Sequence, residues 1–227
     1  MGRFRPAARI GGRRGRHGFC GRRRVRIYGG ELKVAILGGT FDPPHIGHLE
    51  LARAARKQLE LDEVMLMPAR KNPLRSKIAQ SSPTHRFEMA KRLARGHEWL
   101  SVSDLEIRRP GPSYAVDTLE QLHQVRPAEY WWLLGADAIR EFGSWKKPDR
   151  IVRLCRLAVA LRRPLAWEDV LAKVPEEYHP YLDRVEMDPV PVSSTEIRDR
   201  LETGRAVRQW LDPNVLAYIE QNHLYRG

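Results

Sequence analysis

Two histidines in a glycine-containing loop are the residues of this sequence best suited to chemistry. His45 and His48 flank Gly47, and Thr40 supplies a hydroxyl group a few positions earlier. Two imidazole rings that can donate hydrogen bonds suit a reaction in which negative charge builds on transferred and departing phosphate oxygens. Taken alone, two histidines three positions apart could equally form a surface pair or half of a metal site. The sequence on either side of the histidines distinguishes these interpretations.

A buried strand precedes the histidines and a helix follows them. Residues 34–37 are an unbroken apolar run, which is typical of a strand buried on both faces of a parallel sheet. We expect Gly38 and Gly39 to let the backbone turn sharply and to let a ligand approach the main chain. From Gly47 or His48 onward the apolar residues have helical spacing, at Leu49, Ala52, Ala55 and Leu59. The start of such a helix carries unpaired N–H groups and the positive end of the helix dipole, so it predicts a site for a nucleotide polyphosphate.

The loop lacks the two commonest nucleotide-binding motifs. A Walker A loop requires Lys-Ser/Thr at the start of the helix, and a dinucleotide fingerprint requires G-x-G-x-x-G. Residues 38–48 instead read G-G-T-F-D-P-P-H-I-G-H. This string resembles the H-x-G-H signature of the nucleotidyltransferase superfamily, in the form found in the bacterial nicotinate-nucleotide adenylyltransferases.

A second string lies near the other end of the chain, where residues 192–198 read V-S-S-T-E-I-R. Capping of a helix N-terminus explains Ser193 and Thr195, but it leaves Arg198 without a role. The string is similar to the family's second signature, S-x-T-x-I-R, whose arginine contacts the phosphates of ATP. Two signatures in the family's order strengthen the resemblance, which extends from about residue 32 to residue 226.

The resemblance implies an activity and a set of site residues. It implies that ATP and nicotinate mononucleotide react to give deamido-NAD and pyrophosphate, in NAD biosynthesis, with Mg²⁺ carried by the ATP phosphates and no metal ligand named in the protein. The expected catalytic residues are His45, His48 and Arg198. The expected ATP contacts are Gly38, Gly39, Thr40, Phe41, Gly135, Asp137, Ser193, Thr195 and Ile197. The expected nicotinate mononucleotide contacts are Arg75, Tyr114, Ala115 and Trp145.

The acceptor side departs from the family's pattern. Residues 112–118 resemble the family's S-Y-T-x-D-T-L, but Ala115 replaces the usual threonine, which would leave only backbone donors near the nicotinate carboxylate. Residues 72–75 read N-P-L-R in place of the commoner P-P-H-K. Trp145 matches the family's tryptophan that stacks on the pyridine ring, with a core aromatic as the alternative. Because neither departure touches the ATP motifs, the resemblance supports adenylyl transfer more firmly than a preference for nicotinate over nicotinamide.

Other functions stay open beside this one. Another H-x-G-H enzyme could use nicotinamide mononucleotide or phosphopantetheine as the acceptor, and cytidylyltransferases share the motif. Pantetheine-phosphate adenylyltransferases typically have a shorter chain and lack S-x-T-x-I-R. A non-catalytic nucleotide-binding or RNA-binding protein is the alternative from a different class, although intact His45, His48 and Arg198 argue against lost catalysis.

The rest of the chain alternates between strands and helices. Further strands are predicted at residues 64–67, 102–107, 130–134, 157–161 and 184–187. Helices are predicted at residues 82–95, 114–124, 148–154, 168–174 and 213–221, with shorter ones after Asp137 and before Gly204. This alternation predicts an α/β fold with a doubly wound, mainly parallel sheet of five or six strands, the Rossmann-like nucleotidyltransferase fold. Ligands of such sheets bind outside the carboxyl ends of the strands, and we expect the last helix to pack against the sheet.

The positive charge is confined to one end of the chain. The 227 residues carry a net charge of +12, but residues 1–30 contain ten Arg and no acidic residue, which leaves 30 basic and 28 acidic residues in the remainder. We therefore expect a disordered Arg/Gly-rich leader over residues 1–30, one nucleotidyltransferase domain over residues 31–227, and no nucleic-acid partner. An over-called translation start would explain the leader, and a mature N-terminus near Val25, measured by mass spectrometry, would support that explanation.

Cysteine content and hydropathy argue against a disulfide-stabilised protein, a cysteine zinc protein and a membrane-spanning protein. Cys20 and Cys155 lie far apart and belong to no C-x-x-C pair, so neither a disulfide framework nor a cysteine zinc site is expected. No apolar run approaches the length of a membrane span. The sequence predicts a cytoplasmic protein whose partners are ATP and nicotinate mononucleotide, and it leaves a homo-oligomer open.

Overall fold

The computed structural model describes residues 32–73, 79–162 and 165–226. The predicted leader, residues 1–30, and the predicted substrate contact Arg75 lie outside the described residues. Both stay predictions.

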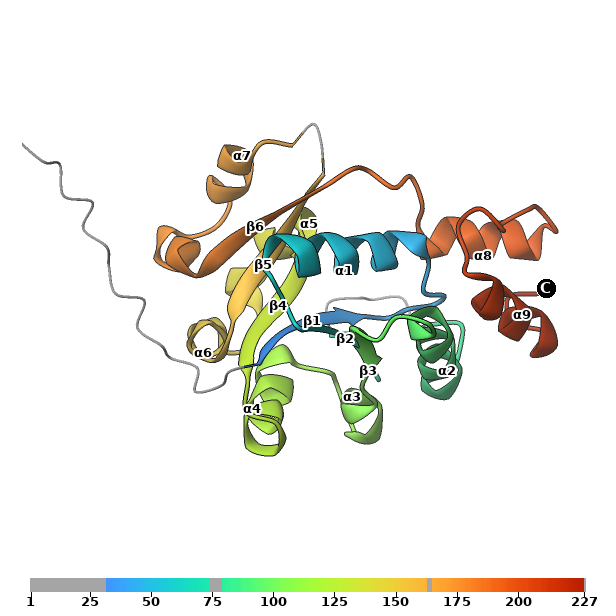
Figure 1. Ribbon diagram of the computed structural model, residues 1–227, viewed down its shortest axis with the longest axis horizontal. Helices are drawn as coiled ribbons and strands as arrows, with labels where there is room; N and C mark the ends of the chain where they lie inside the picture. The colour runs from blue at the N-terminus through green and yellow to red at the C-terminus, as the bar shows by residue number, and fades with distance from the viewer. Residues whose placement is uncertain (1–31, 74–78, 163–164, 227) are drawn as a thin grey trace, which may run out of the picture.

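A six-stranded parallel sheet forms the centre of the molecule, in the order β3-β2-β1-β4-β5-β6 (Figure 1). The strands are β1 Lys33–Gly39, β2 Glu63–Pro68, β3 Leu100–Val102, β4 Glu129–Gly135, β5 Arg156–Arg162 and β6 Leu182–Met187. This confirms the predicted doubly wound α/β fold. The strand order reverses between β1 and β4, and ligands of doubly wound sheets bind at the carboxyl edge of such a switch point.

Helices cover both faces of the sheet. The α-helices are α1 Ile46–Gln58, α2 Pro83–Ala94, α3 Leu105–Arg108, α4 Ala115–Val125, α5 Ala136–Arg140, α6 Pro148–Leu154, α7 Trp167–Leu171, α8 Ser194–Glu202 and α9 Pro213–Gln221. Two short 3₁₀ helices, η1 Phe142–Ser144 and η2 Glu176–Tyr181, complete the described elements.

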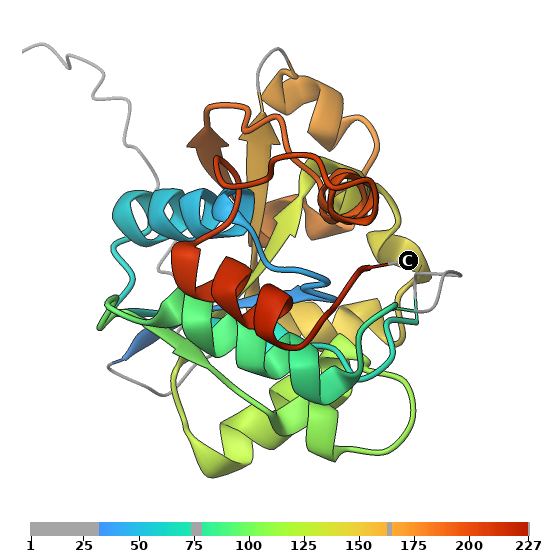
Figure 2. The same cartoon turned by 90° about the vertical axis from the view of Figure 1, so that its right-hand side faces the viewer.

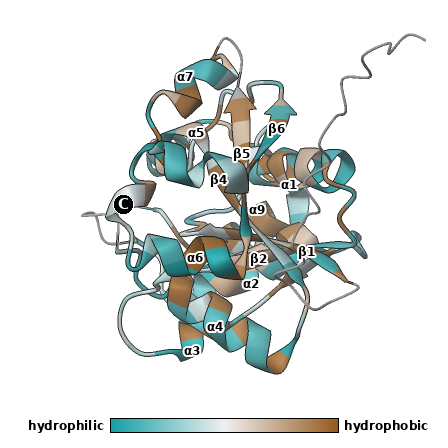
Figure 3. Ribbon diagram, turned by 90° about the vertical axis from the view of Figure 1, so that its left-hand side faces the viewer, coloured by the Kyte–Doolittle hydropathy of each residue, from teal (hydrophilic) through white to brown (hydrophobic). Residues whose placement is uncertain are grey.

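The core is split into two apolar clusters, one on each face of the sheet. One cluster joins the strands to α4, α6 and η1, and the other joins them to α1, α2, α8 and α9. Alternate residues of β4 point to opposite sides, since Trp132 belongs to the first cluster and Trp131 to the second. Figure 3 shows β5 mostly in the hydrophobic colour, as expected of a central strand that is buried on both faces.

One prediction about the elements was wrong. The predicted strand at residues 102–107 stops at Val102, because Ser103 makes the last bond to β2 and its hydroxyl then accepts a hydrogen bond from the N–H of Leu105, at the start of α3. The last helix, α9, packs alongside α2 (Figure 2), and its buried residues Val215 and Ile219 belong to the same apolar cluster as the strands.

The outer edge of β6 is capped by a side chain of α1. The amide of Gln58 donates to the carbonyl oxygen of Glu186 at 2.6 Å and accepts from its N–H at 2.9 Å. Both main-chain groups point away from β5, so the glutamine makes the pair of bonds that a neighbouring strand would make.

Packing against Gly38 provides a test of the fold. A Cβ atom at this position would lie 2.9 Å from Cζ2 of the buried Trp132. Because the indole has no room to retreat, we expect Gly38→Ala to lower the free energy of unfolding by about 1–3 kcal/mol. Gly143→Ala is the matched control, since its Cβ would meet nothing within 4 Å. Equal stabilities of the two variants in urea titrations would contradict this account of the packing.

Candidate nucleotide site

The predicted histidine loop joins β1 to α1 at the carboxyl edge of the sheet. β1 ends at Gly39, and α1 begins at Ile46 with His45 as its N-cap. Between them the chain turns through Phe41, which has a positive φ of 53°, and through a cis peptide between Asp42 and Pro43. The ring of Phe41 is buried and meets the ring of His48 edge-on at 5.0 Å between centroids.

The two histidine rings lie together. Their centroids are 3.9 Å apart, and the N–H of His45 donates to Nδ1 of His48 at 3.2 Å. Nδ1 of His48 is therefore the acceptor nitrogen, which leaves Nε2 to carry the proton when the ring is neutral. His45 is buried and His48 is half-buried. His48 can thus present an N–H donor from a ring whose orientation is set by the backbone.

Glycines in this loop make room for rings. A Cβ on Gly47 would lie 3.0 Å from Nδ1 of His45, so the glycine of the H-x-G-H string accommodates the first histidine. A Cβ on Gly38 would lie 2.9 Å from Trp132, and one on Gly39 would lie 3.0 Å from Phe41. Aromatic side chains therefore fill the space where side chains at positions 38 and 39 would lie, and the expected contacts of Gly38 and Gly39 with ATP stay a prediction.

The second signature docks on the same loop, although more than 140 residues separate the two strings. Nη1 of Arg198 donates to the carbonyl oxygen of Asp42 at 2.7 Å, and Nη2 donates to Oγ1 of Thr195 at 3.3 Å. The hydroxyl of Ser194 donates to the carbonyl oxygen of Pro43 at 2.9 Å. The predicted arginine and the predicted histidines are thus brought to one edge of the sheet.

Two polar atoms at this loop are buried without a partner in the part of the chain that the structure describes. They are Oγ1 of Thr40 and Nε of Arg198. A buried donor left unsatisfied costs free energy, and ligand atoms are one way to satisfy it. Both atoms belong to residues that the sequence assigned to the nucleotide.

Two residues of the second signature have structural roles. Ser193 is the N-cap of α8 and accepts a hydrogen bond from the N–H of Glu196, so the capping interpretation holds for it. Ile197, predicted as an ATP contact, is fully buried in the core, and its N–H donates to the carbonyl oxygen of Ser193. Neither its side chain nor its N–H is available to a ligand, and Ile197 instead anchors α8 to the sheet.

The predicted contacts after β4 lie at the neighbouring strand end. Gly135 is the N-cap of α5, with open space where a side chain would be. Asp137 extends into solvent with a side-chain exposure of 96%, and one of its carboxylate oxygens lies 3.4 Å from the guanidinium of Arg140. Because β4 is paired with β1, both residues lie on the same edge of the sheet as the histidine loop.

Two of the predicted acceptor residues lie next to Lys146, Tyr114 in space and Trp145 in the chain. The Nζ atom of Lys146 lies 4.5 Å from the centre of the Tyr114 ring and 2.9 Å from Oδ2 of Asp117. The preceding residue, Trp145, packs edge-on against Trp132 at 6.4 Å between ring centroids. Trp145 is half-buried, and its indole N–H has no partner among the described residues. Ala115 begins α4 immediately after Tyr114 and is buried.

The structure shows two residues, Arg86 and Asp42, that hold the loops around the predicted site and that sequence reasoning missed. The guanidinium of Arg86 is buried and donates to four carbonyl oxygens, those of Thr40, Ala69, Arg70 and Ser81, at 2.6–3.3 Å. Burial lowers the pKa of Arg86, and nearby Asp42 opposes that shift. Arg86 falls at a helix position that the sequence marks only as charged, so its contacts gave no local signal. Asp42 stands inside the first signature, and that position was the available clue.

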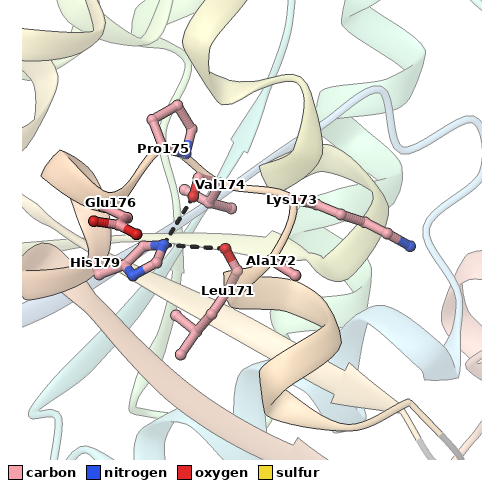
Figure 4. Close-up of a pocket in the computed structure, with 7 residues that line it drawn as sticks. All are labelled: Leu171, Ala172, Lys173, Val174, Pro175, Glu176 and His179. Carbon is pink, nitrogen blue, oxygen red and sulfur yellow. Dashed lines mark hydrogen bonds between the residues drawn. The ribbon is translucent and has the colours of Figure 1, made fainter.

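A hollow of about 450 Å³ lies elsewhere, between α7 and η2 (Figure 4). Nε2 of His179 lies 2.8 Å from the carbonyl oxygen of Val174 and 3.0 Å from that of Leu171, so this ring closes the end of α7. None of the predicted site residues lines it. Within the described ranges, no three His, Cys, Asp or Glu side chains are grouped so that they could hold a metal ion, and no helix is long and apolar enough to cross a membrane.

Comparison with known proteins shows which family this chain resembles. A model of the family described as Cytidylyltransferase-like matches residues 36–200. A protein of Desulfitobacterium hafniense (strain Y51), named as a probable nicotinate-nucleotide adenylyltransferase, is 37% identical over 198 residues, which cover 86% of this chain and 96% of the relative. One of Roseiflexus sp. (strain RS-1) with the same name is 39% identical over 195 residues, which cover 85% of this chain and 98% of the relative.

A solved structure supports the fold. The Plasmodium falciparum nicotinic acid mononucleotide adenylyltransferase complexed with NaAD superposes with a TM-score of 0.70 at 20% identity, over 86% of this chain and 97% of that one. Similarity at this level of identity supports the architecture, while the nearer relatives carry the assignment. The chain belongs to the nicotinate-nucleotide adenylyltransferase family of cytidylyltransferase-like proteins.

Proposed function

We propose that this protein transfers the adenylyl group of ATP to nicotinate mononucleotide, giving deamido-NAD and pyrophosphate, in NAD biosynthesis. The observation that carries the proposal is the meeting of His45, His48 and Arg198 at the β1–α1 loop, in a chain whose relatives bear the name of this enzyme.

The chemistry requires alignment and charge neutralisation. The attacking group is the phosphate of the mononucleotide, which is largely dianionic near neutral pH because its second pKa is about 6. Such a nucleophile needs no base to deprotonate it, so no covalent enzyme intermediate is required. Catalysis then rests on lining up the phosphate with the α-phosphorus of ATP and on stabilising the charge of the departing pyrophosphate.

The geometry suggests a role for each group at the loop. We assign His48 to the oxygens on which charge develops, because the N–H of His45 donates to its Nδ1 and fixes the ring, so that the neutral ring carries its proton on Nε2. His45 would orient its neighbour and contact the phosphates. Arg198, fixed by the carbonyl of Asp42, would use the rest of its guanidinium for the leaving group. Thr40 would supply its buried hydroxyl to the nucleotide.

Mg²⁺ would enter with ATP. The ion prefers oxygen ligands and keeps several waters, so the phosphates and water can hold it without a dedicated cluster of carboxylates. Its contribution would be to neutralise charge on the phosphate oxygens.

The acceptor would bind beside α4. Trp145 offers an aromatic face and an unpartnered N–H, and Tyr114 with buried Ala115 forms the helix start that would face the pyridine carboxylate. Because Ala115 has no hydroxyl, we assign recognition of that carboxylate to backbone N–H groups of α4.

The deciding experiment is a pyrophosphate-release assay with ATP and three acceptors. We expect turnover with nicotinate mononucleotide and much slower turnover with nicotinamide mononucleotide or phosphopantetheine. Faster turnover with either alternative would change the assigned acceptor, and no turnover with any of the three would contradict the proposed activity.

His48→Ala tests the site of charge stabilisation. Removing one such donor costs about 10²–10³-fold in kcat in other enzymes, so we expect a loss of that order with an unchanged thermal unfolding temperature. His97→Ala is the control, because His97 precedes β3 at the opposite edge of the sheet. Near-normal turnover by the His48 variant would refute the role.

Trp145→Leu tests the acceptor side separately. Stacking of a ring on an aromatic side chain is worth about 1–3 kcal/mol, so we expect KM for nicotinate mononucleotide to rise at least 5-fold with little change in KM for ATP. Trp99→Leu, next to β3, should leave both constants within twofold. If KM for ATP rose as much as KM for the mononucleotide, Trp145 would have a general packing role.

A further inference from the structure

The third residue from the C-terminus reaches the histidine loop. After α9 ends at Gln221, the hydroxyl of Tyr225 donates to Oδ1 of Asp42 at 2.7 Å. The two residues are 183 positions apart in the sequence. Leu224 packs against the apolar cluster between them, and its N–H donates to the carbonyl oxygen of Ile219. The end of the chain is therefore folded back onto the nucleotide loop.

The local backbone of this segment is strained. His223 and Tyr225 have φ angles of 50° and 61°, in the left-handed region that residues with a Cβ rarely adopt. Such conformations persist where the surrounding contacts determine them. The bond to Asp42 and the packing of Leu224 are contacts of this kind.

Asp42 is a buried carboxylate that accepts three hydrogen bonds from two separate segments of the chain. Its exposed fraction is 3%, and it accepts from the N–H of Gln80 at 2.8 Å, from the N–H of Ser81 at 3.2 Å and from Tyr225. Tyr225 and Ser81 share Oδ1, while Gln80 bonds to Oδ2. A buried carboxylate that loses a donor is left partly unsatisfied, so we expect it to move toward another donor or toward water.

The backbone of Asp42 carries this effect to the site. The carbonyl oxygen of Asp42 holds Nη1 of Arg198 at 2.7 Å, and the carbonyl oxygen of Thr40 is held by Arg86. A shift of the Asp42 peptide would therefore displace the guanidinium assigned to the phosphates. Burial and the charge of Asp42 raise the pKa of Tyr225, so its hydroxyl stays protonated as a donor throughout the neutral range.

We propose that Tyr225 is a positioning residue for the nucleotide: its hydroxyl fixes Asp42, and Asp42 in turn fixes Arg198 for the polyphosphate of ATP. This inference rests on the proposed function, because the effect on turnover can be measured only if the protein catalyses that reaction. The positioning role affects the binding of ATP and not that of nicotinate mononucleotide.

The test is Tyr225→Phe, which removes one oxygen and keeps the ring. We expect kcat/KM for ATP to fall about 10-fold or more, and KM for nicotinate mononucleotide to stay within twofold. Tyr218→Phe is the matched control. The Tyr218 hydroxyl, on α9, lies 2.9 Å from Nδ1 of His85 on α2, so it bonds to a helix and not to the histidine loop. This variant should keep kcat/KM within twofold.

Stability and binding measurements separate positioning from a structural role. If Tyr225→Phe lowered the unfolding temperature but left kcat/KM of the folded enzyme unchanged, the hydroxyl would serve stability alone and the proposal would be overturned. Equal losses of kcat/KM in the two variants would overturn it as well. Titration with a non-hydrolysable ATP analogue is the second readout, where we expect weaker binding by Tyr225→Phe alone.

The titration also distinguishes this inference from the proposed function. Wild-type protein that bound the analogue but released no pyrophosphate with nicotinate mononucleotide would contradict the proposed reaction. The comparison of Tyr225→Phe with wild type in the titration would still decide the positioning role. Equal analogue affinities of the two proteins would overturn that role.

Discussion

A buried guanidinium holds the active edge of this protein together. Arg86 donates to carbonyl oxygens of residues that follow both β1 and β2 and of the segment that leads into α2. Removing a charge from water is costly, and the cost is offset here by directed bonds to four carbonyls and by the field of Asp42. The carbonyl groups of these loops would otherwise hydrogen-bond to water, and the bonds to Arg86 hold the loops in a single conformation. The proposed nucleotide site is built on those loops.

Aromatic packing links the two halves of the site across the strand switch. Trp132 of β4 occupies the space that Gly38 of β1 leaves open, and Trp145 rests edge-on against the same indole. The side chain assigned to the acceptor and the strand that leads to the histidine loop therefore share one rigid contact. Two substrates bound on either side of it would keep a constant separation, which in-line displacement requires.

Local sequence patterns predicted the elements well and their long-range contacts poorly. The apolar run of β1, the glycines and the H-x-G-H spacing are local, and they sufficed to predict a strand, a loop and a helix start in the right order. The sequence did not predict α3, because β3 has only three residues and ends at Val102. A strand of that length is too short for the spacing of apolar residues to show where it ends. The contacts of Arg86 and Tyr225 span up to 183 positions, and no pattern within a short window encodes them.

The glutamine at the end of α1 has a consequence for how the molecule behaves in a crowded solution. Parallel sheets that end in an open strand can recruit a strand from another chain, because unsatisfied main-chain groups act as a template for aggregation. Gln58 occupies both groups of Glu186 with a flexible amide that offers no continuing ladder. At Glu186 the edge of the sheet is thereby closed by its own helix, and a strand from another chain that paired there would first have to displace the side chain of Gln58.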